Sequence, residues 1–253
     1  MLTWSVHGLS LWQRLASFVA LLALWHIASL LIGARLLPPP ATVAAVLAAD
    51  IADGTLPYHI GITLARVAVS FVLAMLIGAA IGLAMGRLPK LDRFFDGWLV
   101  LFLNVPALVT IVLCYVWFGL VEAAAITAVA VNKIPTVVVT VREGARALSP
   151  DYLEMARVFR FGRMKTLRHV MLPELAPFLL AAARSGLALI WKIVLVVELL
   201  GRSNGVGFQI SVFFQFFDVA SILAYTIAFV IVIQMIEWLV LRPIEQRTSR
   251  WRR

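Results

Sequence analysis

The chain of 253 residues has few charged residues and almost no cysteine. Asp, Glu, Lys and Arg together make up 14% of it, whereas hydrophobic residues make up 62%. A soluble domain carries about a quarter charged residues, so this composition excludes an ordinary soluble enzyme and a disordered chain. The single cysteine, Cys114, excludes an internal disulfide. The composition therefore predicts a polytopic membrane protein.

The sequence also lacks the patterns of an enzyme or a metal protein. The four histidines are far apart and have no metal-ligand spacing. No H-E-x-x-H motif, no supported Ser/His/Asp arrangement and no phosphate-binding G-x-x-x-x-G-K-[ST] sequence occurs. We therefore expect no catalytic residue, no metal site and no cofactor bound by this chain, which we predict not to be an enzyme.

Six apolar stretches are long enough to cross a membrane, because about 20 helical residues span about 30 Å of hydrocarbon. They do not alternate apolar and polar residues as barrel strands do, so all six are expected to be helices of one all-α membrane domain. The predicted spans lie at about 12–33, 62–86, 98–118, 121–141, 177–200 and 220–241.

The distribution of positive charge predicts the orientation of the chain. Six crossings put both termini on one side, and 16 of the 22 Lys and Arg residues fall on that side. Only Arg35 and Arg202 fall on the opposite side. The positive-inside rule then places both termini in the cytoplasm of a multi-pass inner-membrane protein. The net charge of +9 reflects this topology, so no nucleic-acid partner is expected.

Two segments outside the spans are expected to be helical at the membrane surface. Residues Met1–Gln13 mix Leu and Trp with polar residues, which is typical of an interfacial helix; a frayed terminus is the alternative. Residues 41–53 look like a short amphipathic helix on the outer surface. Membrane lipid is therefore an expected partner of both.

One predicted cytoplasmic loop, residues 142–176, is much longer than the other connections, and long loops often carry function. Ser149-Pro150-Asp151 is a helix start, with Ser as N-cap, Pro in the first turn and Asp favourable to the helix dipole. Tyr152, Met155 and Phe159 then recur at helical spacing and predict an apolar stripe on one face.

The second half of this loop is basic. Gly162 permits a break, a run of Arg and Lys follows, and Leu172-Pro173 is expected to end the unit. The loop is thus predicted to be two short helices joined at an angle. The apolar stripe favours docking of a soluble partner, and anchoring at lipid headgroups is the alternative.

Within this loop, Glu154-Met155-Ala156 and, 19 residues after the Glu, Pro173 resemble the EAA loop of permease subunits from bacterial ABC importers. Met155 occupies an alanine position of that motif. Arg160 stands where the family has glycine, six residues after the Glu, and Gly162 follows two residues later. These departures leave the position of the turn open.

Other segments, in the family's order, are similar to the nitrate/sulfonate/taurine-type permease group, so the resemblance covers nearly the whole chain. Each alone is weak, and together with six spans they identify the group. The segments are Leu37–Pro40 (LPPP), Thr63 to Arg66 (T-x-x-R), Trp117–Gly119 (WFG), Trp191-Lys192 with Glu198, and Gly205–Gly207 (GVG) in the outer loop.

The resemblance implies a second permease subunit, expected to be identical, two ATP-binding cassette ATPase subunits and an external solute-binding protein. ATP and Mg would be bound by the partner ATPase. The loop would be a coupling helix that sits in a cleft of that ATPase. The residues expected to form this coupling site are Glu154, Met155, Ala156, Arg160, Gly162, Leu172 and Pro173.

The expected function is therefore the permease subunit of an ATP-driven importer that moves a small solute across the inner membrane. A net positive path would suit an anion such as a sulfonate, taurine or nitrate. A thiamine-precursor-like pyrimidine is the alternative substrate class, and an ion-coupled secondary transporter is the alternative function.

Charged residues within the spans need a physical reason, because each costs about 2.5–3.5 kcal/mol at the bilayer centre on insertion scales. Lys192 lies about 22 Å along its helix from the cytoplasmic end, too deep to reach that interface. We expect five polar residues to line or border the translocation path, with structural ion pairs as the alternative for the lysines. They are Asn104, Asn132, Lys133, Lys192 and Glu198. Arg66, near the outer end of its span, is expected to extend to the interface.

Small residues and prolines predict helix packing and kinks. Gly78, Gly82 and Gly86 recur every four residues and predict close approach of a neighbouring helix. Pro106 and Pro135 are expected to interrupt the third and fourth spans.

Overall fold

The computed structural model describes residues 11–241 and Pro243, and every regular element within them is helical. The interfacial helix expected over Met1–Gln13 lies almost wholly outside the described residues. The helices are α1 (Leu11–Ile32), α2 (Pro40–Ala52), α3 (Thr55–Arg87), α4 (Pro89–Asn104), α5 (Ala107–Phe118), α6 (Glu122–Arg146), α7 (Pro150–Val158), α8 (Arg163–Thr166), a π-helical turn (Leu167–Met171), α9 (Leu172–Gly201), α10 (Val206–Gln215), α11 (Val219–Ile236) and a second π-helical turn (Glu237–Leu241).

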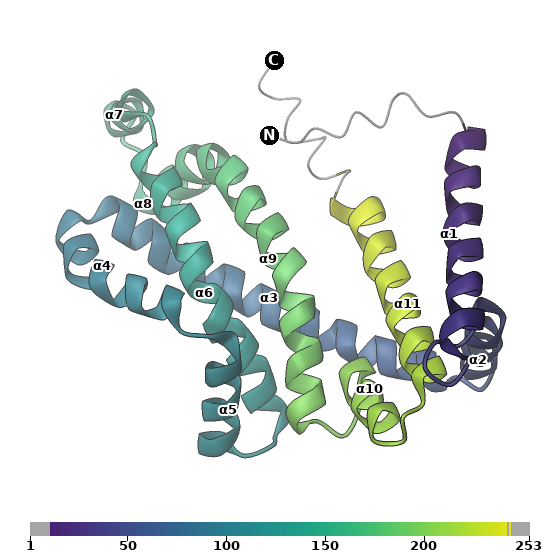
Figure 1. Ribbon diagram of the computed structural model, residues 1–253. Coiled ribbons are helices and arrows are strands. Elements are labelled where there is room, and N and C mark those ends of the chain that lie inside the picture. The colour runs from purple at the N-terminus through teal and green to yellow at the C-terminus, as the bar shows by residue number, and fades with distance from the viewer. Residues whose placement is uncertain (1–10, 242, 244–253) are drawn as a thin grey trace.

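Five of the described helices or helical runs are long and apolar enough to cross a membrane, and a bent pair of helices makes the sixth span if it is counted as one. The third span, expected at 98–118, is interrupted at Pro106 as predicted, and it is bent more sharply than a simple kink. It consists of the second half of α4 and all of α5, which meet at an angle of 96° (Figure 1). Pro106 has no N–H to donate, and Val105 before it is extended, so the helix cannot continue through this point.

The fifth span is longer than expected. The second helix of the loop was expected to end at Leu172-Pro173, and it does not. Helix α8, the π-helical turn and α9 form one apolar helical run from Arg163 to Gly201. The π-helical turn Leu167–Met171 ends two residues before Pro173, and Pro173 stands in the first turn of α9, where proline is tolerated. Pro135 lies inside α6, which continues through it, so the interruption expected in the fourth span does not occur.

Helices α3, α6 and α9 form the centre of the bundle. The stripe of small residues on α3 faces α6, as predicted. A side chain at Gly78 would collide with Val137, and one at Gly82 with the carbonyl oxygen of Val138. Cys114 is buried in the adjoining apolar cluster with Ile111 and Val194, as a small apolar residue.

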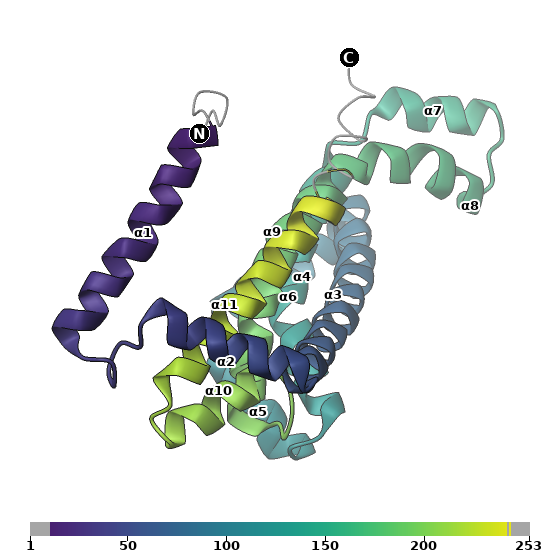
Figure 2. The ribbon, with the colours of Figure 1, turned by 90° about the vertical axis from the view of Figure 1, so that its right-hand side faces the viewer.

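Helix α1 stands apart from the rest of the bundle (Figure 2). Its apolar side chains are exposed over most of its length. At its end, the Leu37–Pro40 segment reverses the chain into α2. Trp25 Nε1 donates to the carbonyl of Pro38 at 3.1 Å, and Ser29 Oγ donates to that of Leu37 at 2.6 Å. The short helix expected at 41–53 is confirmed as α2.

The functional elements lie at two opposite ends of the bundle (Figure 1). Helices α7 and α8 lie at one end, called here the α7 end. Helix α10, the start of α6 and the end of α9 lie at the other, called here the α10 end.

Candidate coupling element and buried polar network

The α7 end carries a helical hairpin whose turn falls at Arg160. Arg160 adopts φ +50°, the left-handed conformation that a helix-terminating residue often takes. Phe161 N–H donates to the carbonyl of Ala156 at 2.8 Å, and Arg160 N–H to that of Arg157 at 2.9 Å. This is a Schellman motif. The turn therefore lies at the position where the resembled motif has glycine, whereas Gly162 is the N-cap of α8 and has an ordinary φ of −65°.

Helix α7 has one buried face and one exposed face. Ala156 is 2% exposed, and Leu153 packs against an apolar cluster formed by Leu148 and Leu175. On the other side, Met155 is 41% and Val158 is 78% exposed. Tyr152, Phe159 and Met164 are exposed as well. The predicted apolar stripe thus points out of the bundle, on a hairpin that projects from it (Figure 2).

The α10 end contains a buried ionic network centred on Arg66 of α3. Arg66 is 4% exposed, and its Nη1 donates to Glu198 Oε1 of α9 at 2.7 Å. Its Nε donates to Glu122 Oε1 of α6 at 2.6 Å. The same guanidinium donates to the backbone carbonyl and side-chain oxygen of Asn204. One side chain therefore joins α3, α6, α9 and the loop that follows α9.

Glu198 is fully buried, and both oxygens of its carboxylate accept hydrogen bonds. Besides Arg66, its carboxylate accepts hydrogen bonds from Thr63 Oγ1 at 2.9 Å and from Gly207 N–H at 2.8 Å. A side chain at Gly205 would collide with this carboxylate, and one at Gly207 would collide with the carbonyl of Leu195. Gly205 also has φ +104°. The two glycines are therefore required for the loop to close over Glu198.

His59 ties the same loop to α3. Its Nδ1 accepts the N–H of Gly205 at 2.9 Å, which leaves Nε2 to contact the side chain of Gln209 at 2.7 Å. The start of α10 is held as well, since Val206 N–H donates to Thr63 Oγ1 at 2.9 Å.

These contacts correct the expectation for Arg66. It does not extend to the interface, because Glu198 and Glu122 compensate its charge inside the bundle. Glu198, which was expected to border the translocation path, is buried, and its carboxylate is enclosed by Arg66, Thr63 and Gly207. Most residues of this network belong to segments that carried the family resemblance, namely Thr63, Arg66, Glu198, Gly205 and Gly207. That resemblance was the one sequence feature that could have identified them as a site, and no such feature marked Glu122.

The other polar residues expected on the path are not brought together. Lys133 is 2% exposed, and its Nζ has no hydrogen-bond partner among the described residues. Lys192 on α9 is exposed, with its Nζ 5.4 Å from the ring centroid of Trp191. Asn132 is half-buried. Asn104 is exposed and donates to the carbonyl of Val100 in its own helix at 2.7 Å.

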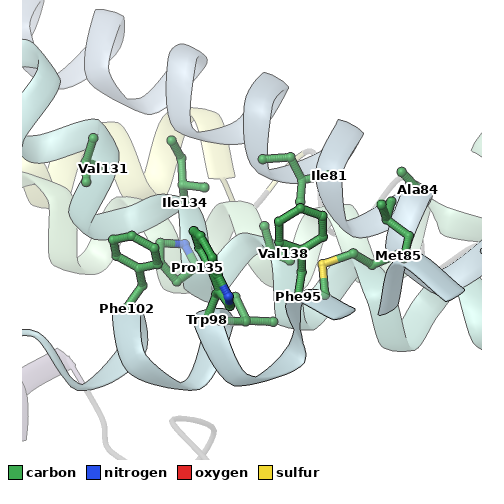
Figure 3. Close-up of a pocket in the computed structure, with 12 residues that line it drawn as sticks. Ile81, Ala84, Met85, Phe95, Trp98, Phe102, Val131, Ile134, Pro135 and Val138 are labelled. Carbon is green, nitrogen blue, oxygen red and sulfur yellow. The ribbon is translucent and has the colours of Figure 1, made fainter. Parts of the chain in front are cut away.

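An apolar cavity of about 440 Å³ lies between α4 and the α3–α6 pair, beside the contact of Leu99 of α4 with Met85 and Val138 (Figure 3). Phe95, Trp98 and Phe102 of α4 face Ile134 and Val138 of α6 across it. The cavity has no convergent polar groups, so it lacks the features of a solute-binding or catalytic site.

Residues 70–242 match the model of the family described as binding-protein-dependent transport system inner membrane component. The chain belongs to this family. It is therefore an inner-membrane permease.

The permease is similar along most of its length to curated relatives. It is 30% identical over 234 residues to the permease SsuC of Bacillus subtilis (strain 168), which covers 92% of this chain and 84% of SsuC. It is 28% identical over 239 residues to the taurine transport system permease protein TauC of Escherichia coli (strain K12), covering 92% and 86% of the two chains.

Among solved structures, a chain of the MetNI methionine ABC transporter in an inward-facing conformation matches with a TM-score of 0.64. The match covers 77% of the permease and 98% of that chain, at 19% sequence identity. This likeness shows a common fold.

The Arg66 network predicts unequal effects of the same substitution at its two carboxylates. Glu198→Gln removes a fully buried charge that compensates Arg66, so it should destabilise the permease by about 3–5 kcal/mol. Glu122→Gln, at a residue 47% exposed, should cost about 1 kcal/mol or less. Thermal unfolding of the two variants in the same detergent would compare them. Equal losses in melting temperature would contradict the assigned difference in burial.

The Schellman motif predicts that Arg160→Gly stabilises the hairpin, because a left-handed conformation costs a non-glycine residue about 1 kcal/mol. Amide hydrogen exchange of residues 156–162 should slow in this variant. Arg157→Gly, inside α7, is the matched control and should speed exchange, since glycine lowers helix propensity by about 1 kcal/mol. Faster exchange in Arg160→Gly would show that the turn lies elsewhere.

Proposed function

We propose that this permease is the membrane subunit of an ATP-driven ABC importer, and that the exposed apolar face of α7 docks into a partner ATPase on the cytoplasmic side. The observation that carries the proposal is the exposed row of Tyr152, Met155 and Phe159 on a hairpin that projects from the bundle. The membrane orientation follows from the positive-inside distribution of Lys and Arg.

The two faces of α7 favour docking over headgroup anchoring. Its inner face packs through Leu153 and Ala156, so the hairpin has a fixed position on the bundle. Its outer face combines large apolar side chains with exposed Arg157 and Arg160 around them. An apolar centre with a charged rim is typical of a protein interface.

Hydrolysis must then come from the partner, because this sequence contains no phosphate-binding loop. ATP and Mg would be bound there. The partner can drive transport only if it binds the hairpin differently in its two states, since a ligand shifts an equilibrium by its difference in affinity. An external solute-binding protein would deliver the solute at the opposite face.

Lys192 supports a translocation path between two copies of the permease. It lies about 14 Å from the end of α9, which is near the middle of the hydrocarbon. It is nevertheless exposed on a single chain. Because an ammonium group facing lipid is costly, Lys192 should face a water-filled path or a second subunit. Asn132 and Asn104, which are at least partly exposed, are proposed to border the same path. Lys133 is buried and is proposed to border it from inside the bundle.

An exposed ammonium group on the path favours a small anion such as a sulfonate, taurine or nitrate as the solute. The similarity to the taurine permease of Escherichia coli agrees with this class. The adjacent solute-binding protein would set the final selectivity.

Docking predicts that Met155→Pro uncouples ATP hydrolysis from uptake, because proline breaks α7 at the centre of its exposed face. Glu154→Lys should also impair coupling, by reversing a charge on the proposed interface. Uptake by a reconstituted complex should fall at least tenfold, and ATPase activity should no longer respond to the loaded binding protein. Met155→Ala keeps the helix and restores the alanine of the resembled motif, so it should transport within about threefold of the parent.

This assay also separates an importer driven by ATP from an ion-coupled secondary transporter. ATP-dependent uptake that requires a copurifying ATPase would support the proposal. Uptake by the purified chain alone, driven by an ion gradient, would overturn it.

The path assignment predicts that Lys192→Met lowers uptake of a small anion at least tenfold and leaves assembly of the complex unchanged. Lys192→Arg, which keeps the charge, should retain most of the uptake. Radiolabelled uptake into proteoliposomes and gel filtration of the complex would measure the two properties. Unchanged uptake by Lys192→Met would remove Lys192 from the path.

A further inference from the structure

A cluster of ion pairs joins the start of α4 to the end of α6, close to the hairpin. Arg142 Nη1 contacts Asp92 Oδ1 at 3.3 Å and Asp96 Oδ1 at 2.6 Å. Arg146 contacts the second oxygen of Asp92, and its Nη1 contacts Glu143 Oε1 at 2.9 Å. These five residues, Asp92, Asp96, Arg142, Glu143 and Arg146, are called here the α4–α6 clamp.

The centre of the clamp is partly shielded from solvent. The side chain of Arg142 is 12% exposed and that of Asp92 is 14% exposed, whereas Asp96, Glu143 and Arg146 are 54%, 50% and 43% exposed. Shielded ion pairs are stronger than fully solvated ones and are less screened by salt. The pairing of Arg142 with Asp92 therefore gives the clamp a firmer centre than isolated surface pairs would.

The α6 side of the clamp is rigidly connected to the hairpin. A side chain at Gly86 of α3 would collide with Ala145, and one at Gly144 would collide with Phe178 of α9, so the end of α6 is closely packed on both sides. Only residues 147–149 separate α6 from α7. Ser149 N–H donates to Glu174 at 3.2 Å, which fixes this short link as well.

The α4 side is packed differently. The apolar cavity lies between α4 and the α3–α6 pair, and Leu99 is the only buried residue of α4. Beyond Asn104 the chain bends by 96° into α5. Tyr115 of α5 donates its hydroxyl to the carbonyl of Val197 of α9 at 2.8 Å. Helix α4 thus packs on α3 and α6 mainly through Leu91 and Leu99 and is otherwise largely exposed. The clamp joins it to α6 at one end, and the break at Val105-Pro106 separates it from α5 at the other.

We propose that the α4–α6 clamp transmits movement of the hairpin to the broken span α4–α5, with Arg142 as the positioning residue. The inference rests on the proposed coupling function of α7. A displacement of α7 moves the end of α6, the clamp carries α4 with it, and the break at Val105-Pro106 lets α4 rotate relative to α5. The clamp stays closed throughout, and the cavity provides the space in which α4 moves.

The test uses two cysteines in place of the central ion pair, in a Cys114→Ala background that removes the native thiol. In Asp96→Cys/Arg142→Cys, the reduced protein has lost the contacts of Arg142. Uptake should fall at least tenfold, and basal ATPase activity of the assembled complex should stay within about twofold of the parent. Cross-linking the two thiols with a short bifunctional reagent closes the clamp again and should restore uptake to within about threefold.

Two single substitutions provide the controls. Both aspartates are bound by the same nitrogen of Arg142, so Arg142→Lys supplies one cation that can replace it and should keep most of the uptake. Arg142→Gln should lose uptake as the reduced cysteine pair does. Lys90→Gln removes an exposed cation from the first turn of α4 and should transport normally.

The outcomes separate this inference from the proposed function. If the parent complex shows no ATP-dependent uptake, the proposed function fails. If the parent transports normally, normal uptake in the reduced cysteine variant overturns the clamp. Failure of the cross-link to restore uptake overturns it too, as does a parallel loss of ATPase activity and complex yield, which would assign the clamp to assembly alone.

Discussion

The buried pair of Arg66 and Glu198 is the interaction on which the rest of the structure depends. Two opposite charges inside a membrane bundle are tolerated only when each is paired and hydrogen-bonded. Here the pairing requires α3, α6 and α9 to keep one register, because Arg66 reaches Glu122 and Glu198 at the same time. The need to enclose Glu198 then fixes the loop over it, including Gly205 and Gly207, and with it the position of α10.

The two ends of the permease differ in how their charges are held. At the α10 end, the guanidinium of Arg66 is buried and bound on several sides. At the α7 end, the clamp around Arg142 is only partly buried, and the helix it holds, α4, lies beside a cavity. The α10 end is therefore fixed on several sides, whereas at the α7 end α4, unlike the closely packed end of α6, has space to move. The contrast supports movement at the α7 end, which is the end where the proposed ATPase would bind.

The sequence alone predicted the helices and the hairpin well, because hydropathy reports burial in lipid and the motif around Glu154 is local. It failed where the result depended on the side of the helix from which a residue projects. Distance along the helix suggested that Arg66 could reach the interface, whereas its orientation points it at Glu198. Pro106 was expected to interrupt the third span, but a missing N–H does not by itself give the size of the bend, which is 96° and turns the span into two helices. The turn at Arg160 could not be placed, since arginine gives no local signal for a left-handed conformation.

Lys192 connects the single chain to its assembly. The charges of Arg66 and Arg142 are paired with carboxylates within the chain, one at each end of the bundle, whereas the Nζ of buried Lys133 has no hydrogen-bond partner among the described residues. Lys192 is different, because it lies at mid-membrane depth and is exposed. Its charge must be solvated by something outside this chain, and lipid cannot do so. The proposed second copy of the permease, with a water-filled path between the two copies, would provide that environment. The same path is where an anionic solute would meet a positive charge.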